Sequence, residues 1–248
     1  MLTTTLPKWL GSRNRVYQNA GNEALLSLLD LRSPGRALDC GCGAGDNARR
    51  LGEQGWAVTG VTLSAEEQRI AARHCESVLI HDLDLGLPRL PDGPFRIVIL
   101  SHLLEHLRDP HSLLRGVRGV LTPDGVIAVA LPNVLYWSQR VRFVLGQFEY
   151  SETGIMDYTH LRFYTYESGR RLLADCGYTI LRQTVEGFVP FPFRRALRCL
   201  PLGPINHLFS RLAPGFFGWQ LLYVARPRVV PGCSNEREAV PHEIYSGG

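Results

Sequence analysis

The feature that most constrains this chain is a glycine-rich turn that directly follows a short apolar run. Residues 37–40 are apolar except for Asp39, and Gly41, Gly43 and Gly45 follow at alternate positions before helix-forming residues begin. Glycine permits positive φ and close approach of a ligand, and the start of a helix offers unpaired N–H groups. A strand, a glycine turn and a helix together form a frame that suits a nucleotide-like ligand, although a tight strand-to-helix turn without a ligand also uses glycine.

The spacing of the glycines restricts which ligand fits. The dinucleotide fingerprint G-x-G-x-x-G would need glycine at the position of Asp46. The chain instead has an acid followed by three glycines at alternate positions. This pattern resembles motif I of class I S-adenosylmethionine (SAM) methyltransferases, and the order of elements from Ala24 to Ala225 is similar to that superfamily.

Apolar segments alternate with helical segments after the turn. Strands are predicted at residues 36–40, 57–62, 77–81, 95–100, 125–130, 178–185 and 220–225. Continuous apolar strands separated by helices predict a parallel sheet covered on both faces. The resemblance implies an α/β, Rossmann-like class I methyltransferase fold, with a seven-stranded, mostly parallel sheet, helices on both faces and a C-terminal substrate cap.

One main domain is expected. The predicted parts are an N-terminal lid segment at residues 1–20, the methyltransferase domain at 21–226 with cap insertions at about 134–166 and 187–219, and a disordered tail at 227–248. The N-terminus lacks the charged-then-apolar build of a signal peptide, and no apolar run approaches the ~18 residues of a membrane span. The six cysteines form no C-x-x-C pair, which favours free thiols and a cytoplasmic location.

The resemblance implies a set of residues around the cofactor. Asp39 would bind the ammonium group of SAM, in part through water. The turn residues Gly41, Cys42, Gly43 and Gly45 would lie against the methionine part of the molecule.

The second strand departs from the superfamily pattern at its end. There the superfamily has an acid that accepts hydrogen bonds from both ribose hydroxyls, but this chain has Thr62. The sequence G-V-T-L-S at this position is similar to that of cyclopropane-fatty-acid-type methyltransferases, which also lack the acid. Glu66, Glu67 or Gln68 could reach back to replace it. Ser64 followed by Glu67 also predicts a capping box at the next helix.

Four more positions complete the implied cofactor site. Asp82 follows the third strand, where the superfamily uses an aspartate to accept from the adenine amino group. The backbone N–H of Leu83 would meet the adenine ring. Leu63 and Ser101 lie at the ends of two other strands and belong to the same predicted set.

The segment after the fourth strand, residues 101–110, reads S-H-L-L-E-H-L-R-D-P. It resembles the LEHL-x-DP segment of small-molecule methyltransferases. His102 is expected to face the acceptor as a general base, and Glu105 and His106 to secure the loop, with His106 also near the substrate. Some quinone-type relatives place two glutamates and a histidine here, but His102 replaces the first glutamate, so no metal is expected. The string also matches the zinc-protease signature H-x-x-E-H, which needs a long helix and a distant third ligand.

A second informative segment is G-I-M-D-Y-T-H-L-R-F-Y-T at residues 154–165. It resembles a D-x-THLR segment of methyltransferases linked to surface-glycan and natural-product pathways. Asp157 and Arg162 could bind hydroxyl groups or a phosphate, and His160 is a second candidate for the catalytic base. Tyr17 in the N-terminal segment is a further candidate substrate contact. An internally hydrogen-bonded loop explains the 154–165 segment equally well.

The resemblance implies a SAM-dependent methyltransferase that produces S-adenosylhomocysteine. The favoured acceptor is a hydroxyl group of a sugar or secondary metabolite. One alternative is a lipid or quinone methyltransferase, favoured by Thr62 and the apolar residues at 188–219. Another is a non-catalytic, methyltransferase-like accessory protein that acts through a partner enzyme.

Arginines lie among phenylalanines in the 188–219 segment. A substrate cap is favoured there over an RNA-binding surface, and peripheral membrane contact stays open. The formal net charge of +4 is too small to indicate nucleic acid.

Overall fold

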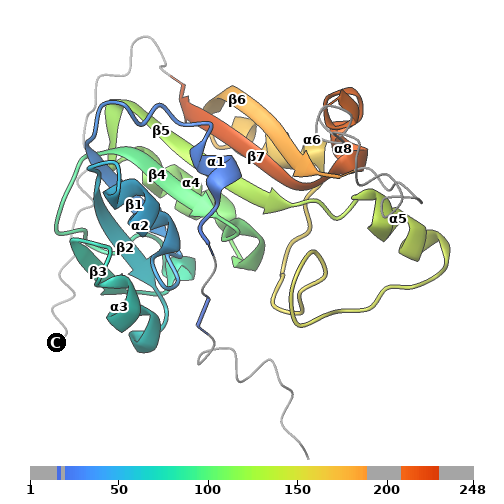
Figure 1. The fold of residues 1–248 in the computed structure, drawn as a ribbon, viewed down its shortest axis with the longest axis horizontal. Coiled ribbons are helices and arrows are strands. Elements are labelled where there is room, and N and C mark those ends of the chain that lie inside the picture. Colours follow the sequence, from blue (N-terminus) through green and yellow to red (C-terminus); the bar gives the residue numbers. More distant parts are fainter. Residues whose placement is uncertain (1–15, 18–19, 189–207, 229–248) are drawn as a thin grey trace, which may run out of the picture.

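A seven-stranded mixed sheet forms the centre of the molecule (Figure 1). The computed structural model describes residues 16–17, 20–188 and 208–228. The strand order is β3-β2-β1-β4-β5-β7-β6. The strands are β1 (Arg36–Cys40), β2 (Ala57–Thr62), β3 (Ser77–Ile80), β4 (Phe95–Ser101), β5 (Leu121–Pro132), β6 (Tyr178–Gly187) and β7 (Gly218–Pro227). β7 runs antiparallel to both β5 and β6, whereas the other pairs are parallel. The predicted fold class is confirmed.

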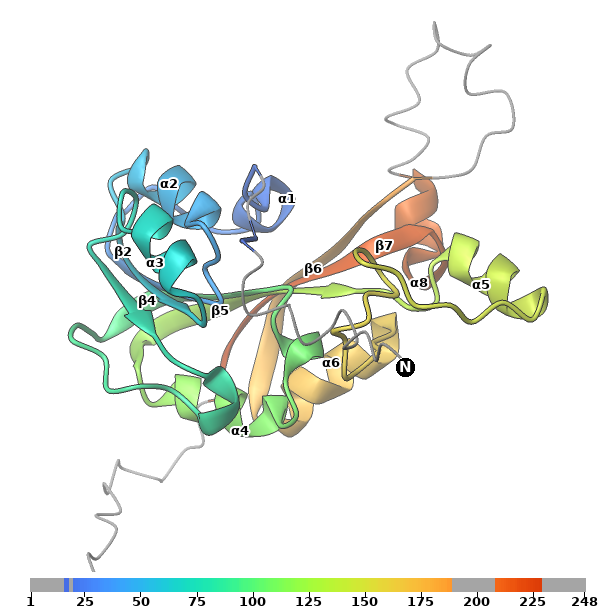
Figure 2. The same ribbon diagram turned by 90° about the horizontal axis from the view of Figure 1, so that it is seen from below.

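Helices cover both faces of this sheet (Figure 2). They are α1 (Glu23–Leu26), α2 (Asp46–Gly52), α3 (Ala65–Ala71), α4 (Pro110–Arg118), α5 (Trp137–Val144), α6 (Tyr166–Asp175) and α8 (Pro214–Phe217), with 3₁₀ turns η2 (Leu83–Leu85) and η3 (Leu104–His106). α1 and α2 contribute to one buried apolar cluster, and α4 and α6 to the other.

The central strands are apolar throughout because each face is buried under helices. In β4, Val98 and Leu100 belong to the cluster beneath α4 and α6, whereas Ile97 and Ile99 belong to the cluster beneath α1 and α2. Successive side chains of a strand point to opposite faces, so a strand covered twice has no polar alternation. This burial fixes β1 and β4 side by side and brings their carboxyl ends to one edge.

The chain leaves the sheet after β5. α5 and the loop before α6 extend from one end of the molecule, and α8 lies at the same end (Figures 1 and 2). Within the described ranges, no helix combines the length and the apolar character that a bilayer crossing needs. Most of the predicted lid, tail and second cap insertion lies outside the described residues.

Candidate active site

The glycine turn between β1 and α2 takes a backbone shape that suits glycine. Gly41, Gly43 and Gly45 have φ angles of +73°, +53° and +84°. A Cβ atom on Gly43 would lie 2.6 Å from the backbone oxygen of Tyr17, and one on Gly41 would lie 3.1 Å from Cδ1 of Leu103. The turn is therefore packed between the N-terminal segment and the loop after β4.

Asp39 precedes the turn and is 1% exposed. No described residue makes a well-aligned hydrogen bond with either carboxylate oxygen, and the Asn47 side chain is only a weak polar neighbour. Burial raises the pKa of Asp39 to about 7, and the neighbouring Asn47 opposes this rise only in part. A buried carboxyl group that lacks a well-aligned hydrogen bond beside a glycine turn is a position that a ligand ammonium would satisfy, so these residues fit the SAM expectation.

The end of β2 shows how Thr62 acquires an acidic neighbour. The hydroxyl of Thr62 donates a short hydrogen bond to the carboxylate of Glu67, which is 5% exposed. The other carboxylate oxygen of Glu67 accepts from the backbone N–H of Tyr17 at 2.9 Å. An acid from α3 thus stands at the end of β2, although the strand itself supplies none.

The predicted capping box at α3 is confirmed in its N-cap half and wrong in its reciprocal half. Ser64 Oγ does accept from the backbone N–H of Glu67 at 3.4 Å. The carboxylate of Glu67 goes to Thr62 and Tyr17 instead of returning to the backbone of Ser64. A buried carboxylate gains more from two donors at the strand end than from one at a helix start, which explains the choice.

The other predicted cofactor positions lie along the same edge of the sheet. Leu63 is exposed directly after β2, and Leu83 is buried at the start of η2. The carboxylate of Asp82 is exposed and accepts from the backbone N–H of Asp84 at 3.0 Å. Ser101 Oγ accepts from the side-chain amide of Asn22 at 3.1 Å. Their contacts with a cofactor stay predictions.

His102 has an unusual backbone and a polar network around its ring. Its φ is +52°, and no other non-glycine residue among those described has a positive φ. This conformation is found at functional sites more often than elsewhere. Its Nδ1 lies 3.3 Å from the carboxylate of Glu105, and its Nε2 forms a short hydrogen bond with Oε1 of Gln220. The Trp219 ring lies parallel to the imidazole, with an interplanar angle of 2° and centroids 6.2 Å apart.

Glu105 controls the charge of His102. Burial by itself would lower the pKa of His102, but the nearby carboxylate of the fully buried Glu105, together with the Gln220 hydrogen bond, outweighs burial and raises it. The pKa of Glu105 is lowered in return, because His102 and His106 outweigh the burial of its carboxylate. Such a pair makes the imidazole a stronger base once it is neutral and stabilises the imidazolium that forms.

Gln220 is a functional candidate that the sequence did not reveal. Its Nε2 donates to Glu186 at 2.8 Å, which turns its Oε1 toward His102 and the side-chain amide of Asn22. The side chain of Asn22 also caps α1, where it accepts from the backbone N–H of Leu25. The three residues Asn22, Glu186 and Gln220 are far apart in the sequence, so no local pattern could have joined them to His102.

A second polar cluster lies beside the first. The His106 and His160 rings meet edge to face, with centroids 4.8 Å apart. Nδ1 of His160 lies 3.1 Å from the carbonyl oxygen of Ile155, so it carries the hydrogen and Nε2 is the acceptor of the neutral ring. Burial lowers the pKa of His160 despite the opposing charge of Glu105. His160 is therefore neutral at physiological pH.

Asp157 holds the loop that carries His160. Its carboxylate accepts from the backbone N–H and the hydroxyl of Thr159, at 2.8 and 2.7 Å, and the Thr159 hydroxyl also contacts His106 Nδ1 at 3.0 Å. These bonds favour the internally bonded loop over a direct substrate contact for Asp157. Tyr17 contacts the glycine turn through its backbone, because its carbonyl oxygen accepts from the N–H of Ala44 at 2.9 Å. The substrate contacts proposed for both residues stay predictions.

Glu105, His106 and His160 have ligand-type atoms within 4.8 Å of one another. The sequence pointed away from a metal here because His102 replaces a glutamate, and His160 comes from a distant loop. The three side chains could surround a cation, but Glu105 is paired with His102. We therefore assign this cluster no metal role.

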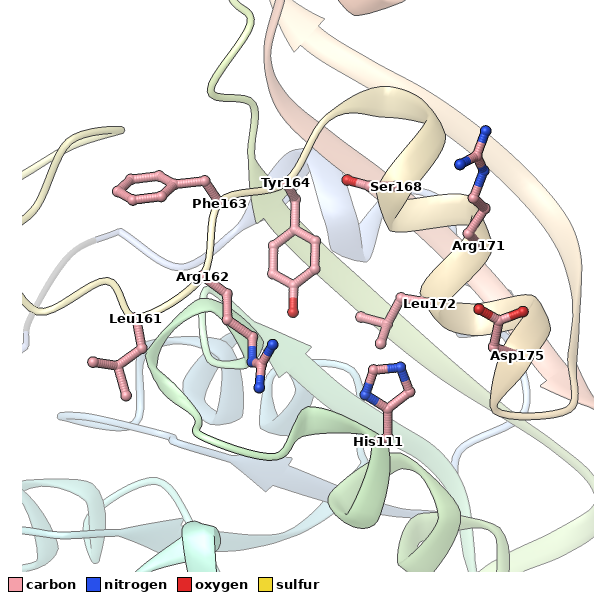
Figure 3. A pocket seen from close by; sticks show the side chains of 9 residues that line it. All are labelled: His111, Leu161, Arg162, Phe163, Tyr164, Ser168, Arg171, Leu172 and Asp175. Atoms are coloured by element: carbon pink, nitrogen blue, oxygen red, sulfur yellow. The ribbon is translucent and has the colours of Figure 1, made fainter. Parts of the chain in front are cut away.

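Arg162 contacts the loop before α4. Its guanidinium donates to the backbone oxygens of Leu107 and Arg108, which holds the loop before α4. It also lines a cavity of about 370 Å³ between that loop and α6 (Figure 3). The cavity is lined by His111, Leu161, Arg162, Phe163, Tyr164, Ser168, Arg171, Leu172 and Asp175. None of the predicted cofactor residues lines it, so we do not place the chemistry there.

Comparison with known families identifies the family of the chain. A family model described as "Methyltransferase domain" matches residues 12–183. The chain belongs to this methyltransferase family. The match confirms the superfamily and the cofactor class, SAM, that the glycine turn predicted.

Curated relatives of this methyltransferase carry one recurring name. Ubiquinone biosynthesis O-methyltransferases are 29% identical over 107 residues in Haemophilus ducreyi (40% of this chain, 45% of the relative) and 33% identical over 104 residues in Caulobacter vibrioides (39% and 40%). The match thus spans less than half the length of these relatives. The protein of that name from Psychrobacter arcticus is 27% identical over 189 residues, which is 72% of each chain.

Solved structures share the fold of this methyltransferase. A SAM-dependent methyltransferase from Mesorhizobium loti superposes with a TM-score of 0.54 at 20% identity, covering 82% of this chain and 95% of the other. One from Methanosarcina mazei gives 0.56 at 17% identity, covering 84% and 99%. At these identities the likeness concerns the fold alone.

Proposed function

We propose that this chain is a SAM-dependent O-methyltransferase that acts on a phenolic hydroxyl of a quinone-type ring. The observation that carries the proposal is the His102–Glu105 pair at the end of β4. The loop that holds this pair packs directly on the glycine turn, through Leu103 and Gly41. A base and the cofactor turn therefore lie at the same edge of the sheet.

The cofactor, when bound, supplies an activated methyl group on a sulfonium. We infer that Asp39 and the residues Gly41, Cys42, Gly43 and Gly45 hold its amino-acid part. Glu67 takes the place of the strand-end acid for the ribose, since its carboxylate already accepts from the hydroxyl of Thr62. Residues 21–226 would form the catalytic domain.

His102 removes the proton of the acceptor hydroxyl in this proposal. Glu105 orients the ring through Nδ1 and stabilises its positive charge. The acceptor hydroxyl replaces Gln220 as the partner of Nε2. General-base catalysis contributes typically ~10²–10⁴-fold, and correct alignment of the two reactants contributes more, about 7–11 kcal/mol. His160, which is neutral with Nε2 as its acceptor, is the alternative base.

The choice of a phenol over a sugar hydroxyl rests on three supports. The curated relatives are named for ubiquinone biosynthesis, which favours the quinone alternative over the sugar or secondary metabolite first expected. A phenol with a pKa near 10, like that of tyrosine, lies within reach of a histidine base, whereas an alkyl hydroxyl is far less acidic. The parallel Trp219 ring beside His102 also offers a flat surface for a planar acceptor.

A product assay tests the proposal. The purified chain with SAM is offered a catechol-type dihydroxybenzene acceptor and a sugar nucleotide, and methylated products are identified by mass spectrometry. We expect a methyl ether on the catechol only. His102→Asn, which retains a residue that tolerates positive φ, should lower kcat at least about 100-fold with SAM affinity unchanged. A methylated sugar would overturn the acceptor class, and loss of turnover in His160→Gln with full turnover in His102→Asn would reassign the base.

A further inference from the structure

The segment that protrudes after β5 carries exposed apolar side chains at its tip. We call residues 136–163 the arm. No residue of its helix α5 is fully buried. Val144 is 88% exposed and Leu145 is 67% exposed, and Phe148 and Tyr150 are also more than half exposed. Such a group of large apolar side chains on one projection is unusual for a surface that meets only water.

The exposed tip is joined to the candidate active site by a row of aromatic rings. His160 lies 6.3 Å from Phe163, and Phe163 lies 6.4 Å from Phe148, measured between ring centroids. Phe148 continues the row to Phe143 of α5 at 5.6 Å. The row of rings leads from the reacting edge of the sheet to the exposed end of the arm.

A second exposed apolar group borders the arm. Arg140 of α5 lies over the ring of Phe216 in α8, 5.4 Å from its centroid. Leu212, which is 71% exposed, precedes α8 on the chain. The two groups therefore lie at the same end of the molecule, where Figures 1 and 2 show α5 and α8 together.

Cationic side chains accompany these apolar groups. Arg142 is exposed within α5, directly before Phe143, and Arg211 is exposed directly before Leu212. The loop after α5 also exposes the acids Glu149 and Glu152, so the cationic side chains are those of α5 and the α8 region. Aromatic and aliphatic side chains next to arginines are the combination that binds the interface of an anionic bilayer, where the chains enter the headgroup boundary and the guanidinium groups meet lipid phosphates. The formal net charge of +4 acts in the same direction.

We propose that the tip of the arm, with the adjoining α8 region, docks on the surface of an anionic lipid bilayer. The shape of the arm favours a bilayer over a second copy of the chain. A projection with side chains such as Val144 and Leu145 at its end can enter a deformable headgroup layer, whereas a stable dimer needs a broad, complementary face. Docking at the arm does not depend on which acceptor the enzyme uses.

Vesicle flotation with the full chain tests this proposal. Phosphatidylcholine vesicles with and without phosphatidylglycerol are compared at low and high salt. We expect the chain to float with the phosphatidylglycerol vesicles and salt to weaken this. Leu145→Gln should lower the partition about tenfold or more, and Arg142→Gln about fivefold. The matched controls are Leu85→Gln, whose side chain is 79% exposed on η2, and Arg73→Gln, an exposed arginine beside α3.

The outcomes distinguish a lipid bilayer from a second copy of the chain as the partner of the arm. Flotation that the two arm variants weaken and the two controls retain supports the proposal. Absence of flotation by a folded chain, or equal losses in arm and control variants, overturns it. Analytical ultracentrifugation without lipid completes the test, since a dimer that Leu145→Gln dissociates would assign the tip to a second copy. Circular dichroism of each variant establishes that it is folded.

Discussion

Replacing Asp39 by asparagine should stabilise the ligand-free protein and weaken its binding of SAM. The carboxyl group is 1% exposed and makes no well-aligned hydrogen bond with the described residues, with the Asn47 side chain only a weak polar neighbour. In the unfolded chain it ionises with an ordinary pKa near 3.9, whereas burial raises its pKa to about 7 in the fold. A charged Asp39 therefore lowers the free energy of unfolding at physiological pH. Asparagine has a similar shape and removes that charge.

The magnitude follows from the two pKa values of Asp39. A difference of about three between them corresponds to about 4 kcal/mol, an upper limit because the asparagine amide also needs partners. Between about pH 4 and pH 7 the folded state binds more protons than the unfolded state, so the contribution of Asp39 to the unfolding free energy falls as pH rises through this window. Below about pH 4 both states are protonated and the cost disappears.

Thermal unfolding without ligand, at low and at high pH, measures this effect. At pH 8, Asp39→Asn should raise Tm by up to about 10 °C for a chain of this size, with a much smaller difference near pH 4. Asp124→Asn, at an exposed aspartate, is the matched control and should change Tm little at either pH. A fall in Tm at pH 8, or an equal rise at both pH values, would refute the reasoning.

Calorimetric titration with SAM supplies the functional half of the Asp39 test. A bound ammonium favours the ionised carboxylate, so binding to the natural chain near pH 6.5 should release a proton. The observed heat should then depend on the ionisation enthalpy of the buffer. Asp39→Asn should bind more weakly and lose that dependence. Buffer-independent heats for the natural chain would show that Asp39 does not meet the ammonium.

Three further outcomes follow from the site. Glu67→Ala should weaken SAM binding about tenfold by calorimetry, and Glu67→Gln less, because the amide oxygen can still accept a hydrogen bond; equal affinity in all three proteins would exclude Glu67 from the ribose site. Gly43→Ala should lower Tm, since φ is +53° and a Cβ meets a backbone oxygen at 2.6 Å, whereas Gly52→Ala, in open space, should not. Glu105→Gln should move the acid limb of the kcat/KM profile to lower pH and lower kcat, because the pKa of the paired imidazole falls; an unmoved limb would mean that His102 is not the base.

The parts of the fold that the sequence predicts are those set by local chemistry. The strands of the sheet follow from continuous apolar runs, and β1, β2 and β4 begin at the predicted residues. The glycine turn was predicted from spacing, and its three glycines do take positive φ. The residues of one short segment determine an apolar strand or a glycine turn, so neither prediction requires knowledge of contacts with distant residues.

The polar network of His102 could not be predicted in the same way. Gln220 reaches His102 from the antiparallel strand β7, 118 residues away in the sequence, and Asn22 reaches Gln220 across 198 residues. A glutamine in an apolar strand shows only that one polar group is buried. Its partner depends on which strands are neighbours in the sheet, which no local pattern states.

Glu67 and Asp157 show that spacing alone leaves the hydrogen-bond partners of a carboxylate open. Glu67 has the spacing of a capping box, but its buried carboxylate accepts from the hydroxyl of Thr62 and the backbone N–H of Tyr17 at the end of β2. Asp157 has the surroundings of a substrate ligand, but it bonds to Thr159, two residues away, as short polar side chains in loops commonly do. Sequence spacing gives the set of partners within reach, and burial selects among them. The ribose-binding role proposed for Glu67 follows from that selection, because burial has placed a carboxylate where the strand lacks one.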